Sequence, residues 1–285
     1  MSKEKSETRY GLHTSVAGGL KEMLKRARAM GENAAQIFVK SNRQWNMGKL
    51  DEKEAGEFRN QKKRQDLWVC AHAGYLINVA GEGGIRTKSI QSLADEIRRA
   101  EDLGLEAIVV HCGSRGDTDP AEARRRAVAG FNQAIEASGT RRIRVALENS
   151  AGQGSSLARD PGEWGELVGG LPKKRRAACL DTAHAFAAGF DLCTEEGRNR
   201  LHKEMKEKIG LENLVVIHAN DSKTDCGSGV DRHAHLGHGK IGGPALRALL
   251  VDPAWQGIPR IGELPPGERE DRENLEFLRG CLPST

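Results

Sequence analysis

The heptapeptide RVALENS, residues 144–150, is a short β-rich apolar run that carries an acidic side chain, Glu148, near its end. Comparable runs recur along the chain, at residues 10–16, 34–39, 67–72, 107–113, 176–182, 214–220 and 259–264. Several of these runs also end on a His, Asp or Glu, namely His72, His111, Asp181, His218 and Glu263. Because parallel strands joined by helices place their carboxyl ends on one face, we expect these side chains to converge into one pocket.

Segments with the period of an amphipathic helix separate the apolar runs. Residues 20–27 and 90–97 carry apolar side chains at i, i+3, i+4 and i+7, and Gly31 and Gly104 then mark helix ends. Further helices are predicted at residues 51–65, 119–138, 160–170, 194–209, 243–250 and 268–280. Strict alternation of strands and helices implies an α/β fold with a parallel sheet.

The number of strands favours a closed (β/α)8 TIM barrel, although six or seven strands in an open sheet would produce a similar pattern. An open sheet binds its ligand between a few strands at one switch point. Here the candidate ligands come from nearly all of the strands. The pattern therefore predicts closure, with a metal site at the C-terminal face of the strands.

Length and composition fit one soluble domain. The 285 residues accommodate a barrel of about 250 residues without a second core, so we expect a barrel at residues 9–285 and a flexible tail at residues 1–8. No apolar run approaches the roughly 20 residues of a membrane span. The charged N-terminus, MSKEKSETRY, lacks the apolar stretch of a secretory signal, which predicts a cytoplasmic protein. A formal net charge of +4 permits a polyanionic partner without establishing one.

Histidine and carboxylate side chains are common zinc ligands, and a catalytic zinc site keeps one position open for water. A lone His or Glu at a strand end is more often a hydrogen-bonding group, but that interpretation does not account for so many around one ring. After the seventh run, Asp231 and His233 form an i, i+2 pair, which points both side chains the same way in extended backbone. They could therefore bind a further metal. The six cysteines have no CxxC spacing and are interpreted as buried thiols.

Longer motifs extend beyond the single candidate ligands. They are GLHTSVAGGL (11–20), KSNRQW (40–45), HAGYLINVA (72–80), HCGS (111–114), LENSAGQG (147–154), CLDTAHAFAAGFDL (179–192), HANDSK (218–223) and DRHAHLGHGKIG (231–242). With these motifs the chain resembles the endonuclease IV family of apurinic/apyrimidinic (AP) endonucleases over nearly its whole length. Several of the motifs are too long to be explained by coincidence.

The resemblance implies a trinuclear zinc cluster at the barrel mouth, and every ligand position of the family pattern is matched. By analogy the three Zn²⁺ ions would be held by His72, His111 and Glu148, by Glu148, Asp181, His218 and Glu263, and by His184, Asp231 and His233. Glu148 would bridge the first two ions, and Glu263 would lie near the nucleophilic water. These two glutamates are the predicted catalytic residues. Neutral histidines would leave a local positive charge that attracts a phosphodiester.

The activity implied by the resemblance is that of a zinc-dependent DNA-repair phosphodiesterase. It would hydrolyse the phosphodiester 5′ to an abasic site in duplex DNA and leave a 3′-hydroxyl and a 5′-deoxyribose phosphate. Arg43, Tyr75 and Leu76 occupy positions that in the family enter the DNA at the damaged site. From spacing alone they would be interpreted as a solvated charge and two packing residues. The family analogy also favours a monomer.

Two other function classes are compatible with part of the pattern. A metal-dependent sugar isomerase or epimerase of the xylose isomerase-like barrel type needs only Glu148, Asp181, His218 and Glu263. It leaves the other five candidate ligands without a role and does not account for Arg43 and Tyr75. A non-enzymatic module that binds damaged DNA does not require an intact hydrolytic metal set. Both alternatives therefore rank below the endonuclease.

Overall fold

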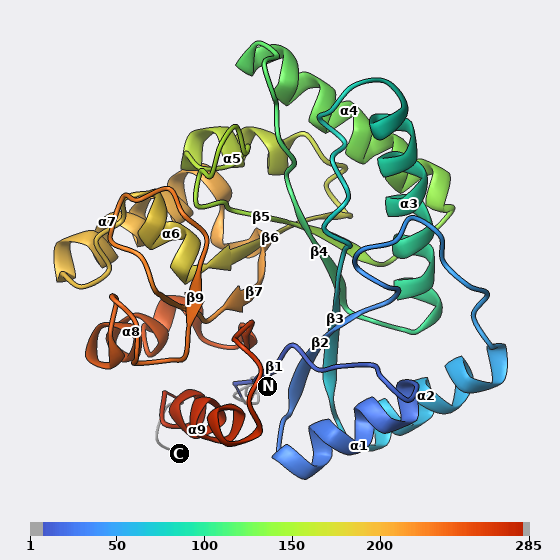
Figure 1. Cartoon of the computed structure of the whole chain (residues 1–285), viewed down its shortest axis with the longest axis horizontal. Helices are drawn as coiled ribbons and strands as arrows, with labels where there is room; N and C mark the ends of the chain where they lie inside the picture. The colour runs from blue at the N-terminus through green and yellow to red at the C-terminus, as the bar shows by residue number, and fades with distance from the viewer. Residues whose placement is uncertain (1–7, 282–285) are drawn as a thin grey trace, which may run out of the picture.

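All eight predicted apolar runs form strands in the computed structural model, which describes residues 8–281 (Figure 1). The strands are β1 (Tyr10–Leu12), β2 (Ala34–Phe38), β3 (Trp68–His72), β4 (Ala107–His111), β5 (Arg144–Glu148), β6 (Arg176–Asp181), β7 (Leu214–His218) and β10 (Arg260–Gly262). Their order around the sheet is β1-β10-β7-β6-β5-β4-β3-β2, and every neighbouring pair is parallel.

The ring closes between β1 and β2, just beyond the end of β1. His13 forms a parallel bridge with Gln36, and the amide of Thr14 donates to the carbonyl oxygen of Gln36 at 2.8 Å. The first and last strands of the sheet order are thereby joined. The prediction of a single (β/α)8 barrel is confirmed.

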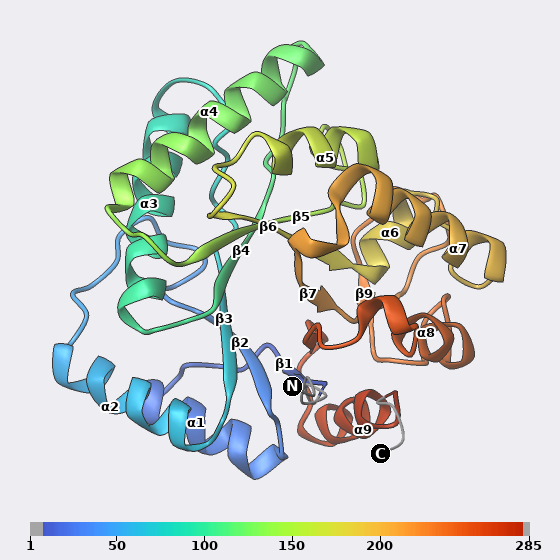
Figure 2. The ribbon, with the colours of Figure 1, turned by 180° about the vertical axis from the view of Figure 1, so that it is seen from behind.

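Helices surround the strands on the outside, as both views show (Figure 1 and Figure 2). They are α1 (Leu20–Met30), α2 (Glu52–Arg64), α3 (Gly83–Asp102), α4 (Pro120–Ser138), α5 (Pro161–Gly169), α6 (Thr182–Ala188), α7 (Glu195–Glu204), α8 (Gly243–Leu250) and α9 (Glu268–Arg279), with short helical turns at Met205–Ile209, Leu211–Asn213 and Pro253–Trp255. Asp51, Asp119, Asp160 and Thr194 cap their helices by accepting hydrogen bonds from first-turn amides. Gly31 ends α1 in the left-handed conformation, at φ 72°.

A helix and a small pair of strands were not predicted, and both carry candidate site residues. Helix α6 begins at Thr182, directly after β6, and its first turn contains His184. Strands β8 (Asp221–Ser222) and β9 (His233–Ala234) form a small antiparallel pair, and His233 opens β9. Both elements follow strand ends, so they add side chains to the face on which the candidate ligands lie.

The alternation of strand side chains places the candidate ligands inside the barrel. One buried cluster consists of Ala34, Cys70, Ala107, Val109, Ala146, Ala177, Cys179, Val216 and Ile261. In β3, β5 and β7 these residues lie two positions before His72, Glu148 and His218, so they share the inner face of the strand with them. The larger apolar cluster fills the space between the strands and the helices. Apolar interior residues therefore lie directly beneath the candidate ligands.

The structure also bears on the predictions for the cysteines, the N-terminal residues and membrane spans. Within residues 8–281 all cysteines are free, but Cys193 and Cys226 are exposed, so the interpretation of every cysteine as a buried thiol is wrong for these two. They lie on loops rather than in apolar strands. Of the predicted tail, residues 1–7 are outside the described range, and Thr8 is buried. Among the described residues, no helix is both long and apolar enough to cross a membrane.

Candidate metal centre

The candidate ligands converge at the carboxyl ends of the strands. Five are the last residues of consecutive barrel strands: His72, His111, Glu148, Asp181 and His218 end β3, β4, β5, β6 and β7. The others follow closely: Glu263 comes directly after β10, His184 lies in α6, Asp231 lies two residues before β9, and His233 opens β9. The structure thus brings all of them together, in three overlapping groups.

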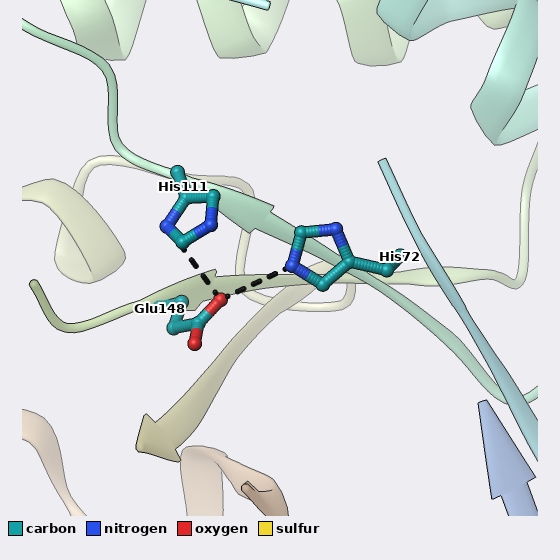
Figure 3. A group of neighbouring side chains, drawn as sticks. All are labelled: His72, His111 and Glu148. Carbon is teal, nitrogen blue, oxygen red and sulfur yellow. Dashed lines mark hydrogen bonds and ion pairs between the residues drawn. The ribbon is translucent and has the colours of Figure 1, made fainter. Parts of the chain in front are cut away.

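The first group consists of His72, His111 and Glu148, whose ligand atoms all lie within 4.8 Å of one another. Figure 3 shows both imidazole rings approaching one oxygen of the carboxylate. Glu148 Oε2 is 3.3 Å from His72 Nε2 and 3.7 Å from His111 Nδ1. Glu148 is completely buried. A buried carboxylate flanked by two imidazoles matches a zinc donor set.

The second group uses the other oxygen of the same carboxylate. His218 Nδ1 lies 2.9 Å from Glu148 Oε1, 3.0 Å from Glu263 Oε2 and 4.0 Å from Asp181 Oδ2. The ligand atoms of these four residues also lie within 4.8 Å of one another. Glu148 therefore presents one oxygen to each group, which is the geometry required of a bridging carboxylate.

The third group consists of Asp181, His184 and His233, whose ligand atoms lie within 4.8 Å of one another, and the predicted ligand Asp231 lies beside both rings. His184 Nε2 lies 3.2 Å from Asp231 Oδ2, and His233 Nε2 lies 3.2 Å from Asp231 Oδ1. His233 Nε2 is also 3.6 Å from Asp181 Oδ2. Despite these short distances, both Nε2 atoms are buried without a hydrogen-bond partner in the described part of the chain. Buried polar atoms are rarely left unsatisfied, so this arrangement fits a cation held between the rings and the carboxylates.

Backbone carbonyls hold three of the rings with one nitrogen free to face the centre. The carbonyl oxygens of Ala73, Asn149 and Glu263 accept hydrogen bonds from Nδ1 of His72, His184 and His233, at 2.7, 3.0 and 2.7 Å. In the neutral ring, each bond leaves the lone pair on Nε2, on the side that faces the centre. Orienting bonds of this type are usual behind metal-binding histidines.

Sequence reasoning missed Gln36 and Asn220, which hold members of the second group. Gln36 is completely buried in β2, where its Oε1 accepts from His218 Nε2 at 2.9 Å and its Nε2 donates to Glu263 Oε1 at 2.5 Å. Asn220 Nδ2 donates to Asp181 Oδ2 at 2.6 Å. The available signal for Gln36 was a lone polar residue inside the apolar run AAQIF.

Interactions between the buried candidate ligands lower the pKa of a carboxylate, Glu148, and raise the pKa of two histidines, His184 and His233. Burial opposes ionisation of Glu148, but the facing His218 and His111 hold its pKa well below the usual range. Burial also lowers the pKa of His184 and His233, yet the charge of Asp181 and its neighbours raises these pKa values to about 10 and about 9. These raised pKa values favour the protonated forms of His184 and His233 beside the carboxylates. A bound cation would replace those protons.

A pocket of about 480 Å³ opens above the centre, and its wall includes His111, His184, Asp231 and Glu263 together with Tyr75. The Tyr75 ring lies 5.7 Å from the ring of His72, between the ring centres. The Tyr75 side chain is nevertheless 57% exposed, and the adjacent Leu76 is 37% exposed. An exposed aromatic group therefore stands at the rim of the candidate metal centre.

Arg43 is exposed on the loop after β2. That loop contacts the loop of Tyr75, because the Tyr75 amide donates to the carbonyl oxygen of Asn42 at 3.2 Å. The three predicted DNA-contact residues therefore lie on two neighbouring loops, one of which reaches the wall of the pocket.

Comparison with known proteins shows what this arrangement resembles. Residues 24–281 match the family described as xylose isomerase-like TIM barrel. A probable endonuclease 4 of Trichlorobacter lovleyi is 37% identical, over 94% of this chain and 98% of that protein. The probable endonuclease 4 of Chloroflexus aurantiacus is 38% identical, over 96% and 98%.

Solved structures give the same result at the level of the fold. The crystal structure of endonuclease IV from Thermus thermophilus matches with a TM-score of 0.87 at 36% identity, over 96% of this chain and 98% of that one. A D-tagatose 3-epimerase-like protein matches with a TM-score of 0.74 at 18% identity, over 96% and 97%. The second likeness shows only a shared barrel.

Proposed function

Because the chain belongs to the endonuclease IV family within the xylose isomerase-like TIM barrels, we propose that it is an AP endonuclease of DNA repair. It hydrolyses the phosphodiester 5′ to an abasic site in duplex DNA and leaves a 3′-hydroxyl and a 5′-deoxyribose phosphate. One observation supports this proposal most strongly. Glu148 presents one oxygen to His72 of the first group and the other oxygen to His218 of the second group. The third group, which contains His184, lies beside them.

The residues fit three zinc ions. The first ion would be held by His72, His111 and Glu148, the second by Glu148, Asp181, His218 and Glu263, and the third by His184, Asp231 and His233. Nitrogen and carboxylate oxygen are suitable donors for zinc. The unsatisfied Nε2 atoms of the third group are also accounted for by a bound cation. When bound there, zinc would supply a water of lowered pKa and would stabilise negative charge on the leaving oxygen.

We assign the catalytic roles within this chain to two glutamates. Glu148 is completely buried and belongs to both the first and the second group, so it fixes the position of one group relative to the other. Glu263 is 14% exposed, lines the pocket and receives a hydrogen bond from Gln36, so it orients the attacking water at the open side. No side chain is required as a nucleophile. The polar groups around the pocket would hold the phosphodiester in the orientation that the attacking water requires.

Arg43, Tyr75 and Leu76 are the proposed DNA-binding residues. Tyr75 and Leu76 are 57% and 37% exposed beside the pocket, and the Tyr75 ring also packs edge-on against Phe38, at 5.4 Å between the ring centres. Side chains of this type can enter a base stack and offset the cost of opening the duplex at a lesion. We further propose that the protein acts as a monomer, because a DNA substrate needs an open barrel face. We also propose that it acts in the cytoplasm.

A sugar isomerase or epimerase is the second candidate. Glu148, Asp181, His218 and Glu263 form a sufficient group for one divalent metal, and this group alone favours that function. Such an enzyme gives no role to the adjacent histidines, including His184 and His233, whose nitrogens face carboxylates. The full set of contacts therefore favours the endonuclease.

The proposal is tested with a labelled duplex that carries one abasic analogue and with a matched undamaged duplex. We expect incision on the 5′ side of the abasic analogue only, with a 3′ end that a DNA polymerase extends. A ketohexose epimerisation assay on the same preparation is run in parallel. Epimerisation without incision would overturn the proposal in favour of the second candidate.

A further inference from the structure

A buried ion pair lies behind the two loops that carry the proposed DNA-binding residues. Lys40 Nζ is 3.3 Å from Glu96 Oε1, and the two side chains are only 4% and 1% exposed. Lys40 lies two residues after the end of β2, and Glu96 lies in α3. Burying two charges is costly unless their remaining donors and acceptors are also satisfied. The other hydrogen bonds of the pair therefore indicate its role.

The ammonium group of Lys40 binds the loop that contains Arg43. It donates to the carbonyl oxygen of Gln44 at 2.5 Å and contacts that of Trp45 at 3.4 Å. Both carbonyls follow Arg43 in the sequence. Lys40 thus links the backbone of Gln44 and Trp45 to the segment that directly follows β2.

The carboxylate of Glu96 binds the second loop. Its Oε2 accepts a hydrogen bond from the amide of Gly74 at 2.9 Å, and Gly74 immediately precedes Tyr75. Its Oε1 also accepts from Ser92 Oγ at 3.2 Å. Within residues 8–281 neither charged side chain makes a hydrogen bond to a candidate metal ligand. The pair therefore connects the loops to each other rather than to the metal centre.

We propose that Lys40 and Glu96 are positioning residues that hold residues 40–45 and 74–76 as one preformed DNA-binding unit. The inference rests on the proposed function. A loop that becomes ordered only on binding loses conformational entropy at that step, whereas a preformed loop does not. The pair should therefore increase the affinity for abasic duplex without taking part in hydrolysis.

The test compares two double variants. Lys40→Met with Glu96→Gln removes both charges while it keeps the side-chain volumes and an acceptor for the Gly74 amide. The matched control is Lys62→Met with Glu106→Gln, which removes a 2.8 Å ion pair between α2 and the residue before β4, at the opposite end of the strands. We expect the first variant to raise KM for abasic duplex by roughly tenfold, with kcat and metal content unchanged. The control should leave KM unchanged.

Hydrogen exchange of the wild-type protein provides a second measurement that does not depend on any variant folding. The amides of Gly74 and Tyr75 should be protected in the DNA-free protein, and DNA should add little protection. An unchanged KM in the first double variant, or an equal rise in the control, would overturn the proposal. So would Gly74 and Tyr75 amides that become protected only with DNA. A wild-type protein that fails to incise abasic duplex would instead contradict the proposed function.

Discussion

The side-chain oxygen of Gln36 accepts a hydrogen bond from Nε2 of His218 at 2.9 Å, across the inside of the barrel. Because an amide oxygen can only accept, Nε2 carries the proton and Nδ1 of His218 is left to face Glu148 and Glu263. The same glutamine donates to Glu263. Gln36 thus sets both the tautomer of one candidate ligand and the direction of another.

Replacing Gln36 by Leu should weaken metal binding, because His218 loses its orienting partner and Glu263 loses a donor. Loss of an orienting group behind a ligand typically costs about 10- to 100-fold in metal affinity. Competition with a chromophoric zinc chelator measures this change, with Gln91→Leu on the exposed face of α3 as the control. Equal affinities for the wild-type protein and the Gln36 variant would show that Gln36 only fills space.

The metal content should be about three ions per chain, and it should depend on Glu148 in a particular way. Replacing Glu148 by Gln weakens both groups that share its carboxylate, so two ions should be lost together. Elemental analysis of dialysed wild-type and variant protein gives the counts. Loss of a single ion would contradict the bridging role, and saturation of the wild-type protein at one ion would favour the isomerase.

Metal affinity should rise with pH. In the metal-free protein, burial lowers the pKa of His184 and His233, but Asp181 and its neighbours raise it to about 10 and about 9, above the ordinary value of 6.5. Zinc must displace those protons, so its binding should release protons near neutral pH and weaken in acid. A zinc titration in a weakly buffered indicator solution detects the release, and zinc binding without any proton release would contradict the assignment.

The same shifts predict the stability of the metal-free protein. Raised histidine pKa values stabilise the fold fully below about pH 6.5, and this contribution is lost as the pH passes about 9 to 10. The melting temperature of chelated protein should therefore fall between pH 7 and pH 10 by more than that of zinc-loaded protein. Parallel pH profiles of the two forms would contradict the assignment of these histidines as ligands.

Recognition should be separable from metal binding. Changing Tyr75 and Leu76 to Ala removes exposed apolar groups that would offset unstacking of roughly a few kcal/mol per base step. Incision of abasic duplex at sub-saturating concentration should slow, while metal content stays constant. Ile85→Ala, which removes another exposed apolar side chain from α3, is the control. An unchanged rate for the double variant would leave Tyr75 and Leu76 with a packing role only.

The barrel and the positions of the candidate ligands could be predicted because both follow from local patterns. Each apolar run specifies a strand, and the parallel arrangement then gathers residues such as His72 and His218 at one end. The role of Gln36 could not be predicted, since its partner His218 is 182 residues away and meets it only across the closed barrel. The same holds for Lys40 and Glu96. Helix α6 was missed because its start coincides with the end of a strand.

The most direct test measures incision of a duplex with a single abasic analogue by the same protein before chelation, after prolonged chelation and after zinc is returned. Product ends are mapped and bound metal is counted in each state. We expect cleavage on the 5′ side of the lesion that disappears as the metals are removed and returns as about three ions per chain are restored. Full incision by protein shown to be free of metal would contradict a hydrolytic metal centre at the barrel mouth.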